Sequence, residues 1–103
     1  NVSSHAAHKT FPDWGAYATT KAAKACFTRH LAAEERAHGI RVSTLTLGAV
    51  NTPLWDTETV HSDFDRHAML DVGQVADALL VLAQQPANQV VEDLTLMPAA
   101  GAL

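Results

Sequence analysis

Tyr17 and Lys21 are the residues best suited to carry out chemistry, four positions apart in an alanine-rich segment. Positions i and i+4 share one face of a helix, so the phenol and the ammonium group are expected to be neighbours. A nearby positive charge favours the phenolate, which equips the tyrosine to donate and accept a proton. The same spacing is common in ordinary surface pairs, so it indicates catalysis only together with other motifs.

A serine precedes this pair. The segment Asn-Val-Ser-Ser at residues 1–4 ends on Ser4, thirteen positions before Tyr17. If these residues are the end of a strand, the Ser4 hydroxyl can donate to the same substrate oxygen that Tyr17 protonates.

A second motif, Gly-Ala-Val-Asn-Thr-Pro, occupies residues 48–53 and follows a strand-like segment. Gly48 at a strand tip permits close approach of the backbone to a ligand. The Thr52 hydroxyl can bind an amide or phosphate oxygen of a cofactor.

The elements expected to position these residues alternate between strands and helices. A strand end at 1–4 and a loop at 5–13 precede a helix over 14–38, which Gly39 ends. Alternating apolar residues predict a strand over 40–47, and residues 48–71 form a long segment typical of a functional lid or a short helix. A helix over 72–85 and a strand over 90–97 follow. This order predicts right-handed crossovers and about three parallel strands of a doubly wound α/β fold, with ligands beyond the carboxyl ends of the strands.

In this order and spacing, Asn-Val-Ser-Ser, Tyr-x-x-x-Lys, Gly-Ile-Arg-Val and Gly-x-Val-x-Thr-Pro resemble the short-chain dehydrogenase/reductase family over essentially the whole chain. The resemblance implies hydride transfer between a nicotinamide cofactor and a carbonyl or alcohol, with NADP(H) slightly favoured over NAD(H). It implies Ser4 as the carbonyl-orienting hydroxyl, Tyr17 as the general acid/base and Lys21 as the residue that holds the nicotinamide ribose. The Val50 main chain and the Thr52 hydroxyl would bind the carboxamide or a nearby phosphate, beside Gly48.

The resemblance also sets expectations for the rest of the protein. The family's usual Pro-Gly is Leu47-Gly48 here, and its glycine-rich phosphate loop and catalytic asparagine have no counterpart in residues 1–103. We therefore expect the chain to be the C-terminal catalytic portion of one Rossmann-like domain, with the N-terminal cofactor-binding half absent and the isolated piece inactive. The full-length enzyme is expected to be a cytoplasmic homodimer or homotetramer.

Trp55, Phe64 and Met69 are expected to line the substrate pocket, because they follow the predicted cofactor motif. Covering the core is the plainer interpretation of these large apolar side chains.

Composition narrows the partners. A net charge of -4, with the seven basic residues scattered, argues against nucleic acid. No apolar run is long enough to span a bilayer. The single cysteine, Cys26, cannot form an internal disulfide, which fits a reducing compartment.

The sequence offers less support for other functional classes. A serine hydrolase lacks a Gly-x-Ser-x-Gly motif. Neither His5 with His8 nor His61 with His67 has a zinc spacing, so no metal is expected. A non-catalytic module for assembly stays open, because the alanine-rich helix suits close packing against a partner.

Overall fold

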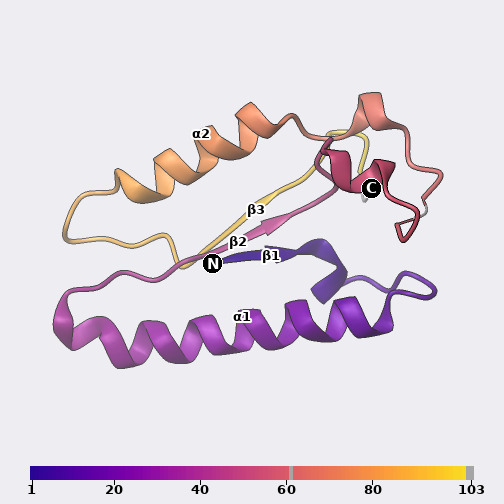
Figure 1. Ribbon diagram of the computed structural model, residues 1–103. Helices are drawn as coiled ribbons and strands as arrows, with labels where there is room; N and C mark the ends of the chain where they lie inside the picture. Colours follow the sequence, from indigo (N-terminus) through magenta and orange to yellow (C-terminus); the bar gives the residue numbers. More distant parts are fainter. Residues whose placement is uncertain (61, 102–103) are drawn as a thin grey trace.

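The computed structural model describes residues 1–60 and 62–101. Its regular elements are β1 (Val2–Ser4), α1 (Gly15–Glu35), β2 (Thr44–Leu47), α2 (Val72–Ala83) and β3 (Asp93–Leu96). One-turn 3₁₀ helices follow β1 (His5–Ala7) and α1 (Arg36–His38), and two more lie between β2 and α2 (Pro53–Asp56 and Arg66–Ala68). Figure 1 shows this alternation of strands and helices, which confirms the predicted α/β order.

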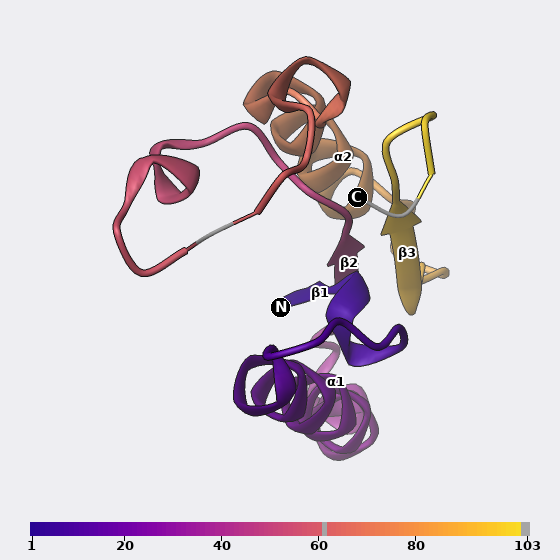
Figure 2. The same cartoon turned by 90° about the vertical axis from the view of Figure 1, so that its right-hand side faces the viewer.

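The three strands form one parallel sheet in the order β1-β2-β3. Ser4 pairs with Leu47, and Leu47 pairs with Leu96, so the carboxyl ends of all three strands lie level at one edge. Seen along the sheet, α1 and α2 lie on opposite sides of the strands (Figure 2). This is the arrangement expected of part of a doubly wound fold.

Contacts between β1 and α1 hold the helix against the sheet. Ala25 and Thr28 are the buried residues of α1. The Asn1 amide donates to Thr28 Oγ1 over 2.9 Å, and the buried Ser3 hydroxyl donates to the Lys21 carbonyl over 3.1 Å. These two bonds fix α1 along β1, because each joins residues far apart in sequence.

The ends of the helices follow the sequence closely. Gly39 has φ 72°, a left-handed conformation that glycine adopts without steric cost, and it closes the turn after α1 as predicted. The side chain of Asp71 caps α2, and Gln74 completes the capping box.

Two strands are shorter than their apolar patterns predicted. β2 begins at Thr44 instead of Ile40, and β3 spans Asp93–Leu96 instead of 90–97. The reason is pairing, because a strand extends only where a neighbouring strand is present to share hydrogen bonds. Residues before Thr44 are tied differently: the Arg41 guanidinium donates to the carbonyls of Gln85, Pro86 and Gln89 over 2.8–3.0 Å.

No helix in residues 1–60 or 62–101 is both long enough and apolar enough to cross a membrane.

Candidate active site

A pocket of about 450 Å³ opens at the carboxyl ends of β1 and β2. Eight of the nine residues predicted to form the site line it: Ser4, Tyr17, Lys21, Gly48, Val50, Thr52, Trp55 and Phe64. They come from the end of β1, the first turns of α1 and the segment after β2. The structure therefore gathers residues that are up to 60 positions apart, 4 to 64, around one cavity.

Ser4 is the last residue of β1 and the N-cap of the 3₁₀ helix that follows. Its Oγ accepts a hydrogen bond of 3.2 Å from the Ala6 N–H. An oxygen used as an acceptor keeps its own proton for donation, so the hydroxyl is oriented and can still donate to a ligand.

Tyr17 and Lys21 lie on consecutive turns of α1. The Lys21 Nζ is 5.4 Å from the centre of the Tyr17 ring, which confirms that the i, i+4 spacing makes them neighbours. The Tyr17 side chain is 44% exposed and faces the pocket that Ser4 also lines. Phenol, ammonium and serine hydroxyl thus share one cavity, with a positive charge beside the phenol.

The segment after β2 contributes Val50 and Thr52. The Val50 carbonyl accepts a 2.8 Å hydrogen bond from the Trp55 indole, which turns that ring toward the segment. Thr52 is the N-cap of the Pro53–Asp56 turn, but within the described chain its side chain makes no capping hydrogen bond. Its hydroxyl is therefore available to a ligand.

Gly48 also lines the pocket, and the structure gives a packing reason for glycine at this position. A Cβ placed there would lie 2.5 Å from Pro98 Cδ and 3.1 Å from Met97 Cε. The close approach that the structure shows at Gly48 is to the chain after β3, and an approach of this glycine to a ligand stays a prediction.

Hydrogen bonds join the two ends of the segment between β2 and α2. Val50 and Leu70 form a parallel bridge, in which the Leu70 N–H donates to Ala49 O and the Asn51 N–H donates to Leu70 O, both over 2.9 Å. The Arg66 guanidinium donates to Asn51 Oδ1, Asp56 Oδ1 and the Thr52 carbonyl over 2.6–3.1 Å. These hydrogen bonds hold Thr52 in place, and no motif in the sequence predicted them.

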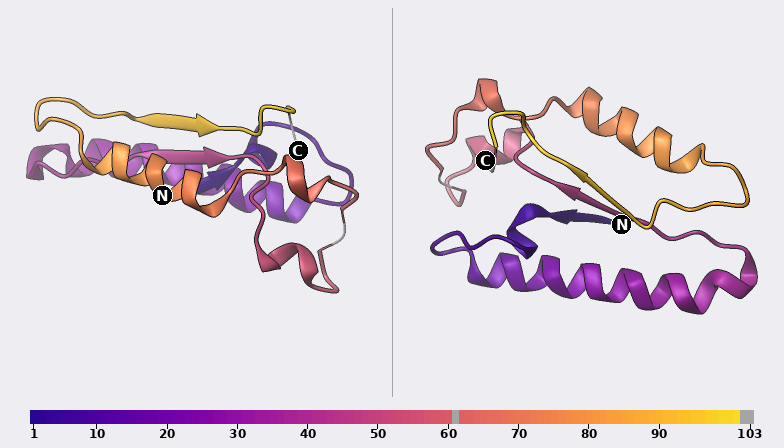
Figure 3. Two further views of the ribbon diagram at one scale, coloured as in Figure 1. Left: turned by 90° about the horizontal axis from the view of Figure 1, so that it is seen from above. Right: turned by 180° about the vertical axis from the view of Figure 1, so that it is seen from behind.

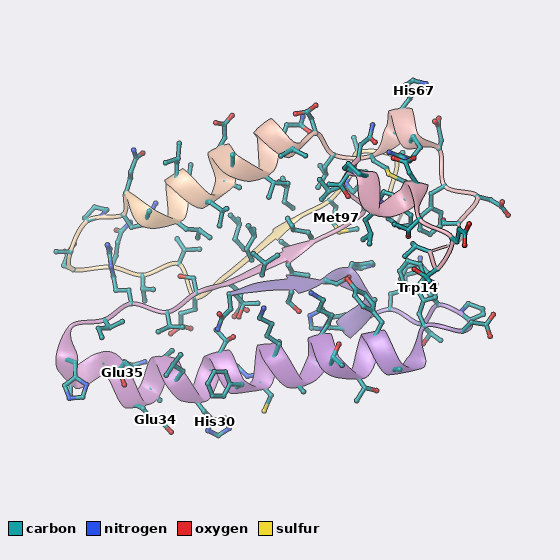
Figure 4. All side chains as sticks on the ribbon, in the orientation of Figure 1. Trp14, His30, Glu34, Glu35, His67 and Met97 are labelled. Carbon is teal, nitrogen blue, oxygen red and sulfur yellow. The ribbon has the colours of Figure 1, made fainter. Side chains whose placement is uncertain are left out.

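Met69 is the exception among the predicted site residues. It lines a separate hollow with Leu96, Met97 and Pro98, away from the pocket of Tyr17. Its neighbour Leu70 is drawn into the bridge to Val50, which turns this end of the segment away from the cavity. Figure 4 shows Met97, of the separate hollow, near the end of β3, and Trp14, of the Tyr17 pocket, near the start of α1.

Two aromatic residues of the pocket were not among the predicted site residues. Phe11 and Trp14 line the cavity with Trp55 and Phe64. The sequence pattern predicts a polar loop over 5–13 and a helix that starts near Trp14. The signal that could have found these two residues is Pro12-Asp13, a turn dipeptide with an aromatic residue on each side.

Among residues 1–60 and 62–101, no group of three or more His, Cys, Asp or Glu side chains is placed to hold a metal ion. His61 lies outside the described residues.

Known proteins resemble this chain in sequence and in fold. A family model described as short chain dehydrogenase matches residues 1–62. The chain belongs to the short chain dehydrogenase family. An uncharacterized oxidoreductase of Staphylococcus haemolyticus is 31% identical over 98 residues, which cover 95% of this chain and 41% of the relative.

Two further proteins are similar to this chain. The pig (Sus scrofa) protein named carbonyl reductase [NADPH] 2 is 33% identical over 84 residues, 77% of this chain and 34% of its own. A solved structure titled short chain dehydrogenase/reductase family protein superposes with a TM-score of 0.80 at 31% identity, covering all of this chain and 45% of that one. The chain thus spans less than half the length of these relatives.

Proposed function

We propose that this chain supplies the catalytic groups of an oxidoreductase that uses NAD(P)(H) to interconvert a carbonyl and an alcohol. One observation carries the proposal: Ser4, Tyr17 and Lys21 line one pocket at the carboxyl ends of parallel strands. Open α/β sheets bind their ligands at this edge.

The polar groups of the pocket fit a nicotinamide nucleoside. An ammonium, as in Lys21, suits ribose hydroxyls, and the Thr52 hydroxyl with the second lone pair of the Val50 carbonyl suits a carboxamide. The bound nicotinamide would supply the hydride. NADP(H) stays the slightly favoured form, which the NADPH in the name of the similar pig protein supports.

The proposed chemistry of the chain is a proton transfer to an oriented oxygen. The Ser4 O–H, held by the Ala6 N–H, donates to the substrate carbonyl oxygen and fixes its position. The Tyr17 O–H passes its proton to that oxygen as negative charge develops there, and Lys21 stabilises the phenolate that remains. In the alcohol-to-carbonyl direction the phenolate accepts the proton.

The test uses the full-length protein with NADPH and then NADH, following nicotinamide absorbance over a panel of ketones and aldehydes. The proposal predicts cofactor oxidation that depends on the carbonyl compound. Saturable cofactor binding without turnover of any carbonyl or alcohol would instead favour the non-catalytic module. Analytical ultracentrifugation would then measure the oligomeric state of that module.

A further inference from the structure

Five aromatic rings form a cluster along one wall of the pocket. Trp14 is at its centre: its ring centroid lies 5.1 Å from that of Phe11, 5.8 Å from Tyr17, and 6.3 Å from both Trp55 and Phe64. Phe64 also contacts Phe11 and Trp55, at 6.2 and 5.8 Å. These are the tilted and edge-to-face arrangements that aromatic pairs prefer.

The cluster is only partly buried. Phe11, Trp14, Trp55 and Phe64 are each of intermediate exposure, and all four line the cavity that Ser4 and Tyr17 also line. Part of the surface of these rings therefore faces the pocket. Apolar surface facing an open cavity is stabilised when a ligand covers it.

A tight turn builds the cluster. The Trp14 N–H donates to the Phe11 carbonyl over 3.2 Å, with Pro12 and Asp13 at the two central positions. Asp13 has φ 67°, a left-handed conformation that is uncommon outside glycine. This is the pattern of a turn with proline first and a positive φ second. It brings the Phe11 and Trp14 rings together immediately before the helix that carries Tyr17.

The charges of the pocket select against anions. Among the described lining residues, Asp13 and Lys21 are the charged ones, and Lys21 lies beside Tyr17. The Arg66 guanidinium is committed to Asn51 and Asp56, so it does not serve as an anion site. A substrate carboxylate or phosphate beside the rings would meet the Asp13 carboxylate, and Lys21, the cation of the described lining, is assigned to the cofactor ribose under the proposed function.

We infer that the pocket takes an uncharged carbonyl compound or alcohol bearing an aromatic ring, and that Trp14 determines this specificity. The inference rests on the proposed function for its reacting group. The substrate's ring lies against Trp14, Trp55 and Phe64, and its carbonyl oxygen reaches Ser4 and Tyr17.

The test compares acetophenone, 4-acetylbenzoate and 2-butanone with the full-length protein. Calorimetry measures the dissociation constant of each ketone, and initial rates give kcat/KM. Acetophenone should exceed both other ketones by about tenfold or more, since an apolar subsite discriminates by roughly that factor. Trp14→Ala should lower kcat/KM for acetophenone about 10- to 100-fold and for 2-butanone by much less.

Three variants keep the inference decidable. Phe64→Leu removes a ring from the opposite side of the cluster and should lower the preference for acetophenone even if Trp14→Ala fails to fold. Trp14→Phe keeps an aromatic ring at this position and should retain most of the preference for acetophenone. Phe27→Ala is the matched control, because Phe27 lies on α1, is 60% exposed and does not line the pocket; its preference should equal that of the parent.

The outcomes separate the two proposals. Turnover of all three ketones with equal kcat/KM would overturn the aromatic specificity, and a preference for 4-acetylbenzoate would overturn the selection of an uncharged substrate. Either result would leave the oxidoreductase standing. Selective binding of acetophenone that depends on Trp14, without turnover, would support the subsite and overturn the proposed reaction.

Discussion

Tyr17 has a charged neighbour on one side and an aromatic neighbour on the other. Lys21 Nζ lies 5.4 Å from its ring centre, and the Trp14 ring meets it edge to face at 85°. All three residues are fixed by the same helix or its N-cap, so their relative positions depend on local backbone geometry alone. This is why spacing in the sequence sufficed to predict the Tyr17–Lys21 pair.

Lys21→Ala in the full-length protein should raise the KM for nicotinamide cofactor about 10- to 100-fold, because a hydrogen bond from a charged donor is worth that much when its partner is left unpaired. Lys24→Ala is the control, since Lys24 is exposed on the same helix and outside the pocket. Steady-state kinetics with the cofactor varied would measure both. Equal KM values for Lys21→Ala and Lys24→Ala would show that Lys21 is only a surface charge.

Among the elements, residues 48–71 were the least predictable part of the site. Their position after a cofactor-like motif predicted that they contribute to the site. The two short 3₁₀ helices fit the expected lid or short helix. The sequence did not predict three features of this segment: the hydrogen bonds of Arg66, the bridge between Val50 and Leu70, and the position of Met69. Each depends on contacts between residues far apart in sequence, which periodicity does not encode.

The same reasoning explains the strands. Alternation of apolar residues found β2 and β3, but only the pairing of neighbours sets where they start and stop. Likewise, the contacts of Phe11 and Trp14 with Phe64 join two segments about fifty residues apart, so turn residues alone could not reveal the cluster.

Gly48→Ala should destabilise the full-length protein by about 1–3 kcal/mol, because the new Cβ meets the rigid Pro98 ring and the chain must shift. Gly15→Ala is the matched control at the start of α1, where a Cβ meets nothing within 4 Å. It should change stability by less than about 1 kcal/mol, toward greater stability. Urea unfolding measures both. Equal stability of the two variants would contradict the packing assigned to Gly48.

At the scale of the whole molecule, the described surface is larger than that of a compact domain. The chain measures 44 × 27 × 21 Å, an elongated shape visible in Figure 3. Its accessible surface is 6825 Å², whereas a compact protein of 11.0 kDa exposes about 5,600 Å². In α2, Leu79, Leu80 and Val81 are 45–55% exposed, and no residue of that helix is buried.

Such a surface predicts marginal stability for these residues alone. The buried apolar residues are few and mostly small: Ala6, Ala25, Leu45, Ala49 and Leu70. We therefore expect the purified 103-residue polypeptide to show no cooperative thermal unfolding and to bind NADPH and NADH weakly or not at all. Circular dichroism melts and fluorescence titration test this. A cooperative melt whose midpoint rises with micromolar cofactor would show a self-sufficient module.

The central claim is that Tyr17 transfers the proton in a nicotinamide-dependent reaction, and Tyr17→Phe in the full-length protein tests it most directly. The substitution keeps the ring and its contact with Trp14 but removes the transferable proton. We predict that kcat falls about 10²- to 10⁴-fold while the dissociation constant of the cofactor stays within a few-fold of the parent. A variant whose kcat lies within a few-fold of the parent would contradict the assignment of Tyr17 as the general acid/base.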